Sequence, residues 1–200
     1  EFAVDFAEFC GRIGLKRTLC TAGYVLKKPL QKMLAHFEAV TVTYKGATDD
    51  FYRHVVDGSL STLHETLLTI KSEGKWLEVA TLIVPTLNDS PEDIRSIAKW
   101  IKGNLGEDTP WHLERFNPQF KLTQLPPTSQ NTMETARKIG LDAGLKFVYL
   151  SNISPHEGNH TYCPSCQRPI IRRLGFKITE NLLNNGRCSY CQAKIPGRWT

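Results

Sequence analysis

Apolar residues recur every three or four positions in several stretches of the chain, and these stretches alternate with short, continuous apolar runs. The first spacing is typical of amphipathic helices, and the runs are typical of buried strands. Helices are predicted over residues 2–13, 30–37, 49–56, 60–72, 91–102 and 132–143. Strands are predicted over residues 17–21, 39–44, 76–84, 111–116 and 146–150. Strands and helices that alternate in this way predict βαβ units, a parallel sheet and an α/β fold.

The loops after the predicted strands are the expected place for a ligand site, because ligands bind beyond the carboxyl ends of parallel strands. The segments in these places are Thr21-Ala22-Gly23-Tyr24, Thr43-Tyr44-Lys45-Gly46, Val84-Pro85-Thr86 and Phe116-Asn117-Pro118. Asn88 is interpreted as a helix-start residue, since Asn88-Asp89-Ser90-Pro91 offers an N-cap and a proline in the first turn.

Four of the six cysteines lie after His156, where short alternating runs replace the strand–helix pattern. We therefore predict two domains, residues 1–155 and residues 156–200. Cys163 and Cys166 form one C-x-x-C pair, and Cys188 and Cys191 form a second pair, with twenty-one residues between the two pairs. Two such pairs give the tetrahedral sulfur cage that zinc favours, although iron fits the same cage. Four thiolates leave no open coordination position, which predicts a structural zinc ribbon with a hairpin that turns at Gly175.

Two other uses of these cysteines are less favoured. Disulfides require an oxidising compartment that nothing else in the sequence indicates. A thioredoxin-like redox pair lacks its βαβ context. Cys10 and Cys20 stand alone and are interpreted as small buried apolar residues.

His156-Glu157-Gly158-Asn159-His160 matches the H-E-x-x-H signature of zinc proteases. That chemistry requires both histidines on one face of a helix, with the glutamate as base. Pro155, Gly158 and Asn159 make this segment poor in helix formers, so we interpret it as a polar linker.

The composition of the 200 residues, 40% hydrophobic and 22% charged, excludes collagen-like, low-complexity and wholly disordered chains. No run approaches the ~20 apolar residues of a membrane helix, and no basic leader precedes the first helix. We expect a cytoplasmic protein with no membrane partner. Because the chain opens with Glu1 inside a predicted helix, we also expect a fragment whose N-terminal part is missing.

The net charge of +5 comes from basic residues that are scattered along the sequence. This pattern favours a mixed, solvated surface over a nucleic-acid footprint, and it fits an anionic small molecule or an acidic partner. Nucleic-acid binding through the cysteine-rich segment is a weaker option. The basic residues there are Arg168, Arg172, Arg173, Lys177 and Arg187.

Four long segments carry a resemblance to a known family. They are PWHLERFNPQFKL at residues 110–122, TLIVPTLNDS at 81–90, HEGNHTYCP at 156–164 and IPGRW at 195–199. These segments resemble passages of the AmmeMemoRadiSam-system radical SAM proteins, which are relatives of pyruvate formate-lyase activating enzymes. The resemblance covers essentially the whole chain.

The resemblance implies an incomplete (βα)6 partial TIM barrel, followed by the zinc ribbon. The family binds S-adenosylmethionine (SAM) and a 4Fe–4S cluster, which is held by a C-x-x-x-C-x-x-C loop. That loop and the family's G-E-P motif are absent from this sequence. The cluster and SAM are therefore expected only in a full-length parent enzyme that generates a radical on an unknown substrate, and this chain is predicted to be inactive alone.

The SAM-binding positions implied by the resemblance are Thr21, Gly23, Thr43, Lys45 and Asn117. Thr21-Ala22-Gly23-Tyr24 matches the family's T-N-G-Y with Ala22 in place of asparagine, and Thr43 stands where D-L-K-G has aspartate. Asn117 stands where related enzymes often carry histidine. These departures support the alternative hypothesis, a degenerate, non-catalytic barrel whose zinc ribbon binds a protein partner.

Overall fold

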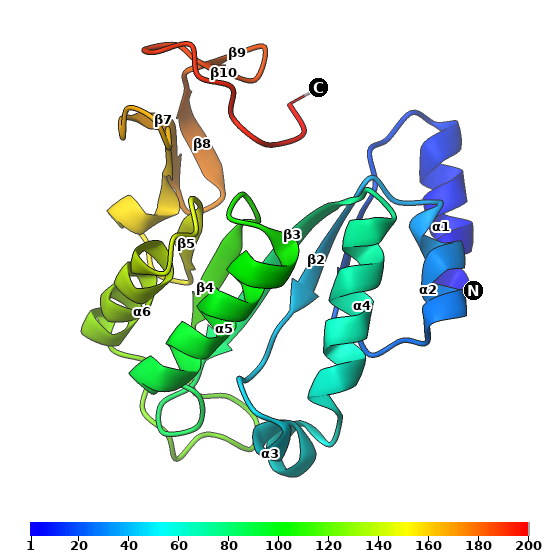
Figure 1. Ribbon diagram of the computed structural model, residues 1–200, viewed down its shortest axis with the longest axis vertical. Coiled ribbons are helices and arrows are strands. Elements are labelled where there is room, and N and C mark those ends of the chain that lie inside the picture. Colours follow the sequence, from blue (N-terminus) through cyan, green and yellow to red (C-terminus); the bar gives the residue numbers. More distant parts are fainter. Residues whose placement is uncertain (200) are drawn as a thin grey trace. The chain divides into compact units, whose positions relative to one another are not determined.

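The computed structural model describes residues 1–199. The chain forms two compact units, of which the first is Glu1–Ala80 and the second begins at Thr81. Its main sheet has five strands in the order β1-β2-β3-β4-β5 (Figure 1). They are β1 (Thr18–Thr21), β2 (Ala39–Thr43), β3 (Trp76–Ile83), β4 (Trp111–Arg115) and β5 (Val148–Ser151). The predicted α/β fold with a parallel sheet is confirmed.

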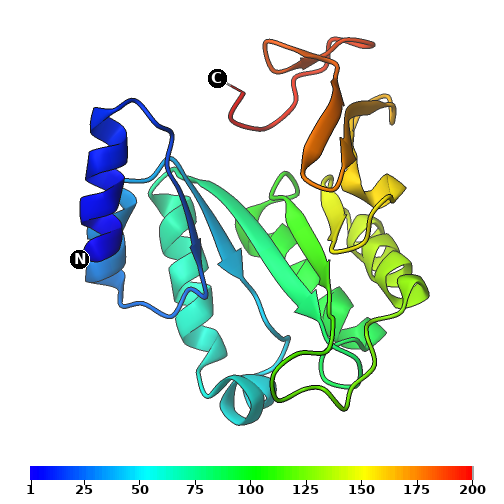
Figure 2. The ribbon, with the colours of Figure 1, turned by 180° about the vertical axis from the view of Figure 1, so that it is seen from behind.

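The first unit packs two helices on one face of its strands. Its helices are α1 (Phe2–Arg12), α2 (Lys27–Leu34), α3 (Asp49–Phe51), the π-helical turn η1 (Tyr52–Val56) and α4 (Leu60–Ser72). Leu30 of α2 and Leu67 of α4 are fully buried, as are Val40 and Val42 of β2. Side chains alternate between faces along a strand, so Thr41 and Thr43 lie on the face opposite Val40 and Val42. Figure 2 shows this open face.

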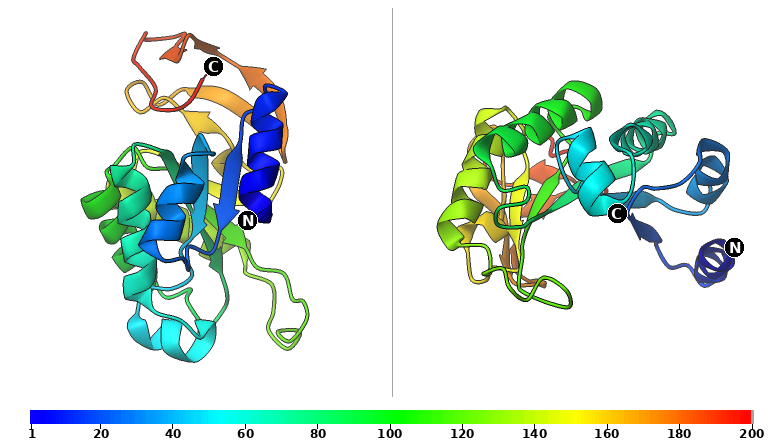
Figure 3. Two further views of the ribbon diagram at one scale, coloured as in Figure 1. Left: turned by 90° about the vertical axis from the view of Figure 1, so that its right-hand side faces the viewer. Right: turned by 90° about the horizontal axis from the view of Figure 1, so that it is seen from below.

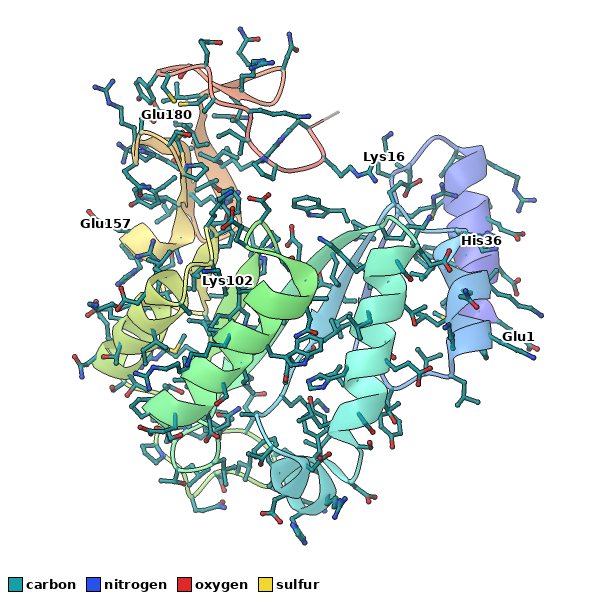
Figure 4. All side chains as sticks on the ribbon, viewed as in Figure 1. Glu1, Lys16, His36, Lys102, Glu157 and Glu180 are labelled. Atoms are coloured by element: carbon teal, nitrogen blue, oxygen red, sulfur yellow. The ribbon has the colours of Figure 1, made fainter. Side chains whose placement is uncertain are left out.

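Most of helix α1 is not buried, since Ala7 is its one buried residue. It lies on the other side of β1 from α2 (Figure 3). The Glu8 carboxylate of α1 lies 3.6 Å from Nδ1 of His36, and Figure 4 labels His36 beside α1. Its apolar stripe is largely exposed, at Phe2, Phe6, Phe9 and Ile13.

The second unit repeats the βα pattern with α5 (Pro91–Leu105) and α6 (Gln130–Asp142). Figure 1 shows both helices on the same face of β4. Trp111 and Leu113 of β4 are fully buried, and the indole N–H of Trp111 donates to Thr81 Oγ1 at 2.9 Å. His112 and Tyr149 alternate with these buried residues, and their rings stack 5.0 Å apart on the open face.

The cysteine-rich segment adds small antiparallel elements to the second unit. They are η2 (Glu157–Asn159), β6 (Thr161–Tyr162), β7 (Pro169–Leu174), β8 (Lys177–Asn181), β9 (Leu183–Asn184) and β10 (Arg187–Cys188). Leu174 pairs with Lys177, so the predicted hairpin turn at Gly175 is confirmed. The domain boundary predicted near residue 155 stays a prediction. The segments on its two sides are in contact, for example through the hydroxyl groups of Tyr149 and Thr161 at 3.0 Å.

Three expectations about local structure need correction. Helix α2 begins at Lys27 and not at residue 30, with Pro29 in its first turn. Residues 49–56 form α3 and a π-helical turn in place of one helix. The N-cap and first-turn proline predicted for α5 are present as Ser90, which accepts the N–H of Asp93, and Pro91, but Asn88 lies before them and does not cap the helix. Asn88 is buried and braces the preceding loop, accepting from Val84 N at 2.7 Å.

No helix among residues 1–199 has the length and apolar character needed to cross a membrane.

Candidate metal centre and strand-end site

The four C-x-x-C cysteines lie in two turns with the same hydrogen-bond pattern. The N–H of Cys163 donates to Arg168 O, and Gln167 N donates to Cys163 O, both at 2.9 Å. The N–H of Cys188 donates to Ala193 O, and Gln192 N donates to Cys188 O, again at 2.9 Å. Gln167 and Gln192 have φ values of 58° and 61°. Each turn therefore aims its two sulfur atoms to one side.

The two turns bring their sulfur atoms together. A tetrahedral ion with metal–sulfur bonds of ~2.3 Å separates its ligand atoms by ~3.8 Å. Sγ of Cys163 lies 3.6 Å from Sγ of Cys191, and Sγ of Cys166 lies 3.8 Å from Sγ of Cys188. All four sulfurs lie within 4.8 Å of one another and none is in a disulfide, whose bond would be about 2.05 Å. The four cysteines thus form a metal-binding site whose geometry suits a single ion.

The electrostatics of this site differ between the two cysteines of the second turn. Burial opposes ionisation of Cys188, but the backbone N–H groups of Cys191 and Tyr190 face its sulfur and hold its pKa at about 7. The N–H of Ala193 faces Cys191, yet burial and the three neighbouring sulfurs raise the pKa of Cys191 to about 12. Four adjacent thiolates repel one another, so full ionisation requires a bound cation.

The H-E-x-x-H segment forms no metal site. Residues 157–159 make a single 3-10 turn, with His156 as its N-cap. Nδ1 of His156 accepts the N–H of Gly158 at 2.9 Å, and its Nε2 is bonded to Glu134 at 3.0 Å. Among residues 1–199, the four cysteines are the one group of three or more His, Cys, Asp or Glu side chains placed to hold a metal. The segment is a capped turn with Gly158 and Asn159 buried, and its interpretation as a linker stays a prediction.

The carboxyl end of β1 holds Thr21 and Gly23 in a tight turn. Thr21 Oγ1 accepts the N–H of Gly23 at 3.1 Å, and Gly23 O accepts the hydroxyl of Thr66 at 2.7 Å. Gly23 has a φ of +73°, and a Cβ there would lie 2.8 Å from the side chains of Leu63 and Val42. Thr21 and Gly23 therefore both stabilise this turn. A role in binding SAM stays a prediction for each.

The carboxyl end of β2 lies beside that of β1, since Thr21 pairs with Val42 in parallel register. Thr43 follows Val42 and lies on the open face, whereas Thr21 lies on the helix-covered face with Val42. Lys45 is half-buried in the loop beyond. Cys20 is exposed, contrary to the expectation that it is buried. Asn117 is exposed in the loop after β4, in the second unit.

Tyr44, within the predicted strand-end segment, and Tyr52, which no sequence pattern indicates, hold the loop at Lys45. The Tyr52 hydroxyl accepts the N–H of Lys45 at 3.0 Å, and burial raises the pKa of Tyr52 to about 12. The Tyr44 hydroxyl is hydrogen-bonded to Nε2 of His64 at 2.6 Å. Burial lowers the pKa of His64, so its neutral ring accepts this bond. A spacing of seven residues across a π-helical turn gives no periodic signal, which is why Tyr52 was not predicted.

Two curated proteins match the sequence, whereas no family model does. The chain is 38% identical over 197 residues to the uncharacterized protein MJ0808 of Methanocaldococcus jannaschii, covering 98% of this chain and 58% of that protein. It is 28% identical over 135 residues to the pyruvate formate-lyase-activating enzyme of Clostridium pasteurianum, covering 62% of this chain and 56% of that enzyme. The chain thus spans less than two thirds of either relative.

Solved structures share the fold. A domain of pyruvate-formate lyase-activating enzyme from Bacteroides vulgatus superposes with a TM-score of 0.65 and 14% identity, over 76% of this chain and 90% of that domain. A radical SAM methyltransferase from Sphaerobacter thermophilus gives a TM-score of 0.53 and 17% identity, over 68% of this chain and 40% of that one. The chain is therefore a distant homologue of pyruvate formate-lyase-activating enzyme with the α/β fold of radical SAM domains.

Proposed function

We propose that this chain is the C-terminal portion of a radical SAM enzyme of the AmmeMemoRadiSam type, with an incomplete barrel and a structural zinc ribbon. The observation that carries the proposal is the adjacency of two strand ends. β1 and β2 are parallel and in register, so the Thr21–Gly23 turn and the Thr43–Lys45 loop leave the sheet at the same edge. Ligands of parallel α/β sheets bind at that edge. The homology and the shared fold support the same function.

Lys45 is the residue proposed to hold the SAM carboxylate, as a point charge on a loop that Tyr52 fixes. The Thr43 hydroxyl on the open face and the turn at Thr21 and Gly23 complete the proposed set in the first unit. Asn117, in the second unit, is a separate prediction. SAM and the iron–sulfur cluster of a complete enzyme supply the radical chemistry on a substrate that is not known. The residues of this chain bind and orient the cofactor.

Zinc is the metal proposed for the four cysteines. Four thiolates saturate a tetrahedral ion, so the site is structural. The buried core beside it holds Phe147, Ile170 and Ile195 together with Cys163 and Cys188. A core of this size is small, so the metal supplies much of the folding free energy of the segment. Metal analysis separates zinc from iron, which fits the same sulfur cage.

Because SAM is expected in the full-length parent enzyme, direct binding of SAM to that parent protein tests the proposal. We expect saturable binding in calorimetry, weakened about tenfold by Lys45→Gln, since a charge-assisted hydrogen bond is lost. Lys27→Gln is the matched control, because it removes the same charge from the start of α2 in the same unit. Equal weakening by both substitutions would argue against a specific role for Lys45.

The second candidate function is a non-catalytic module that binds a protein partner through the ribbon. Ala22 and Thr43 favour it, since neither provides the amide or carboxylate that the family motif carries. A full-length parent protein that is folded and metal-loaded, yet shows no SAM binding at millimolar concentration, would favour this candidate over the first.

A further inference from the structure

A cavity of about 310 Å³ lies in the second unit, beside β5, α6 and the first cysteine turn. Its volume is at the lower end of the range for ligand pockets. Its walls include Arg137, Phe147, Val148, Tyr149, His160 and Tyr162. None of these six residues belongs to the proposed SAM site or ligates the metal, although the metal-binding Cys163 also borders the cavity. The chemistry of these six residues has no assigned use.

Arg137 brings a positive charge to this cavity. The residue is half-buried on α6, and its Nε donates to Val148 O at 3.0 Å. Its guanidinium carbon lies 5.9 Å from the centre of the Tyr162 ring. Within residues 1–199, no carboxylate forms an ion pair with Arg137. A partly desolvated guanidinium with its Nη groups available is a strong site for a carboxylate or phosphate.

His160 adds a neutral donor to the same wall. Its Nδ1 accepts the backbone N–H of Arg173 at 3.2 Å, which leaves Nε2 to carry the ring proton. Burial and the nearby Arg172 lower the pKa of His160, so the neutral ring prevails. An N–H donor of this kind complements the charge of Arg137.

The other charged residues of the cavity wall do not cancel its preference for an anionic ligand. Lys146 is ion-paired with Glu107 at 2.7 Å and Asp108 at 2.9 Å, so its charge is balanced. Glu157 is the acid of the lining, and it is exposed and points outward from η2 in Figure 4. Exposure screens its charge, which therefore opposes an anion only weakly.

We propose that this cavity binds a small ligand that carries a carboxylate or phosphate on an aromatic or apolar body. Arg137 and His160 hold the anion, while Phe147, Val148, Tyr149 and Tyr162 pack against the body. The inference does not depend on the proposed radical chemistry.

Calorimetric titration of the zinc-loaded chain with phenyl phosphate, inorganic phosphate and phenol tests this proposal. We expect phenyl phosphate to bind at least tenfold more tightly than either part alone. Arg137→Gln should weaken it at least tenfold, Arg137→Lys less, and Glu157→Gln should tighten it two- to threefold. Lys138→Gln, which removes the same charge from an exposed neighbour on α6, should change nothing.

Two results would overturn the proposal. One is the absence of saturable phenyl phosphate binding to the folded, zinc-loaded chain at millimolar concentration. The other is equal binding by Arg137→Gln and the unsubstituted chain. Because Arg137 also donates to Val148 O, the thermal unfolding of each variant is measured beside its affinity. If Arg137→Gln does not fold, Arg137→Lys and Glu157→Gln decide the case, and unchanged affinity in both refutes the proposal.

Discussion

Gly23 and Tyr52 shape the strand-end site by acting on the backbone. Gly23 has a left-handed conformation and lies against Leu63 and Val42. Tyr52 fixes the N–H of Lys45 from a π-helical turn, a distortion found frequently at functional sites. The two residues set the paths of the loops after β1 and β2, and so determine where Thr43 and Lys45 stand.

Replacing Gly23 by alanine should destabilise the first unit more than the same change at Gly14. Both glycines have φ near +75°, which costs an alanine about 1 kcal/mol. A Cβ at Gly14 meets nothing within 4 Å, whereas one at Gly23 meets two side chains at 2.8 Å. Overpacking adds about 1–3 kcal/mol at Gly23 alone. Urea unfolding of both variants measures the difference in the free energy of unfolding. Equal losses would show that the side chains around Gly23 move aside at no cost.

At the scale of elements, the outer edge of β5 shows why the parallel sheet ends there. The outer edge of β5 is covered by side chains, since Arg137 Nε donates to Val148 O and Asn159 Nδ2 donates to Leu150 O at 2.7 Å. Carbonyl groups occupied in this way cannot accept a further strand. This explains why the parallel sheet ends at β5 and the chain continues into small antiparallel elements.

Those small elements should depend on their metal. We expect one metal ion per chain, and we expect chelation to unfold residues 156–199 while α4 keeps its protection, because the small core is joined through four thiolates. Amide hydrogen exchange before and after chelation measures both regions.

Serine substitutions distinguish the four metal-binding cysteines from the two cysteines outside the site. Cys191→Ser should lose the metal, whereas Cys20→Ser, at an equally exposed cysteine outside the site, should retain it. Elemental analysis of both variants is the measurement. A full metal content in Cys191→Ser would contradict the four-cysteine assignment.

At the scale of the whole molecule, the cysteine count limits the chemistry of this chain. Four of the six cysteines share one metal site, and Cys10 and Cys20 are single thiols. A 4Fe–4S cluster of the radical SAM kind needs three cysteines of its own, which a C-x-x-x-C-x-x-C loop provides in the enzymes that the sequence resembles. Residues 1–199 offer no second group of three ligands.

Anaerobic reconstitution of the zinc-loaded chain with iron and sulfide should therefore give no 4Fe–4S cluster. Visible absorption and electron paramagnetic resonance after reduction are the measurements. The zinc-free chain, treated in the same way, accounts for iron that enters the four-cysteine site. A reduced cluster whose resonance changes when SAM is added would refute the prediction.

Much of the architecture follows from local sequence. Long, periodic segments such as 60–72 and 76–83 were predicted almost to the residue, because apolar spacing and helix-cap residues act within a few positions. The metal site followed from the C-x-x-C pairs alone, since the spacing within each pair fixes the turn. The bracing role of Asn88 does not follow from local sequence, because its hydrogen-bond partners, Val84 and Leu82, are set by loop packing and not by helix capping.

The sequence by itself determined the order of strands and helices, the parallel sheet and the four metal ligands, because each depends on periodicity or on a fixed short spacing. Only the tertiary structure decided that Thr21 and Thr43 lie on opposite faces, that Tyr52 holds Lys45, and that Arg137 enters a cavity with no counter-ion among residues 1–199. Those outcomes depend on strand register and on contacts between distant segments, and no local pattern encodes them.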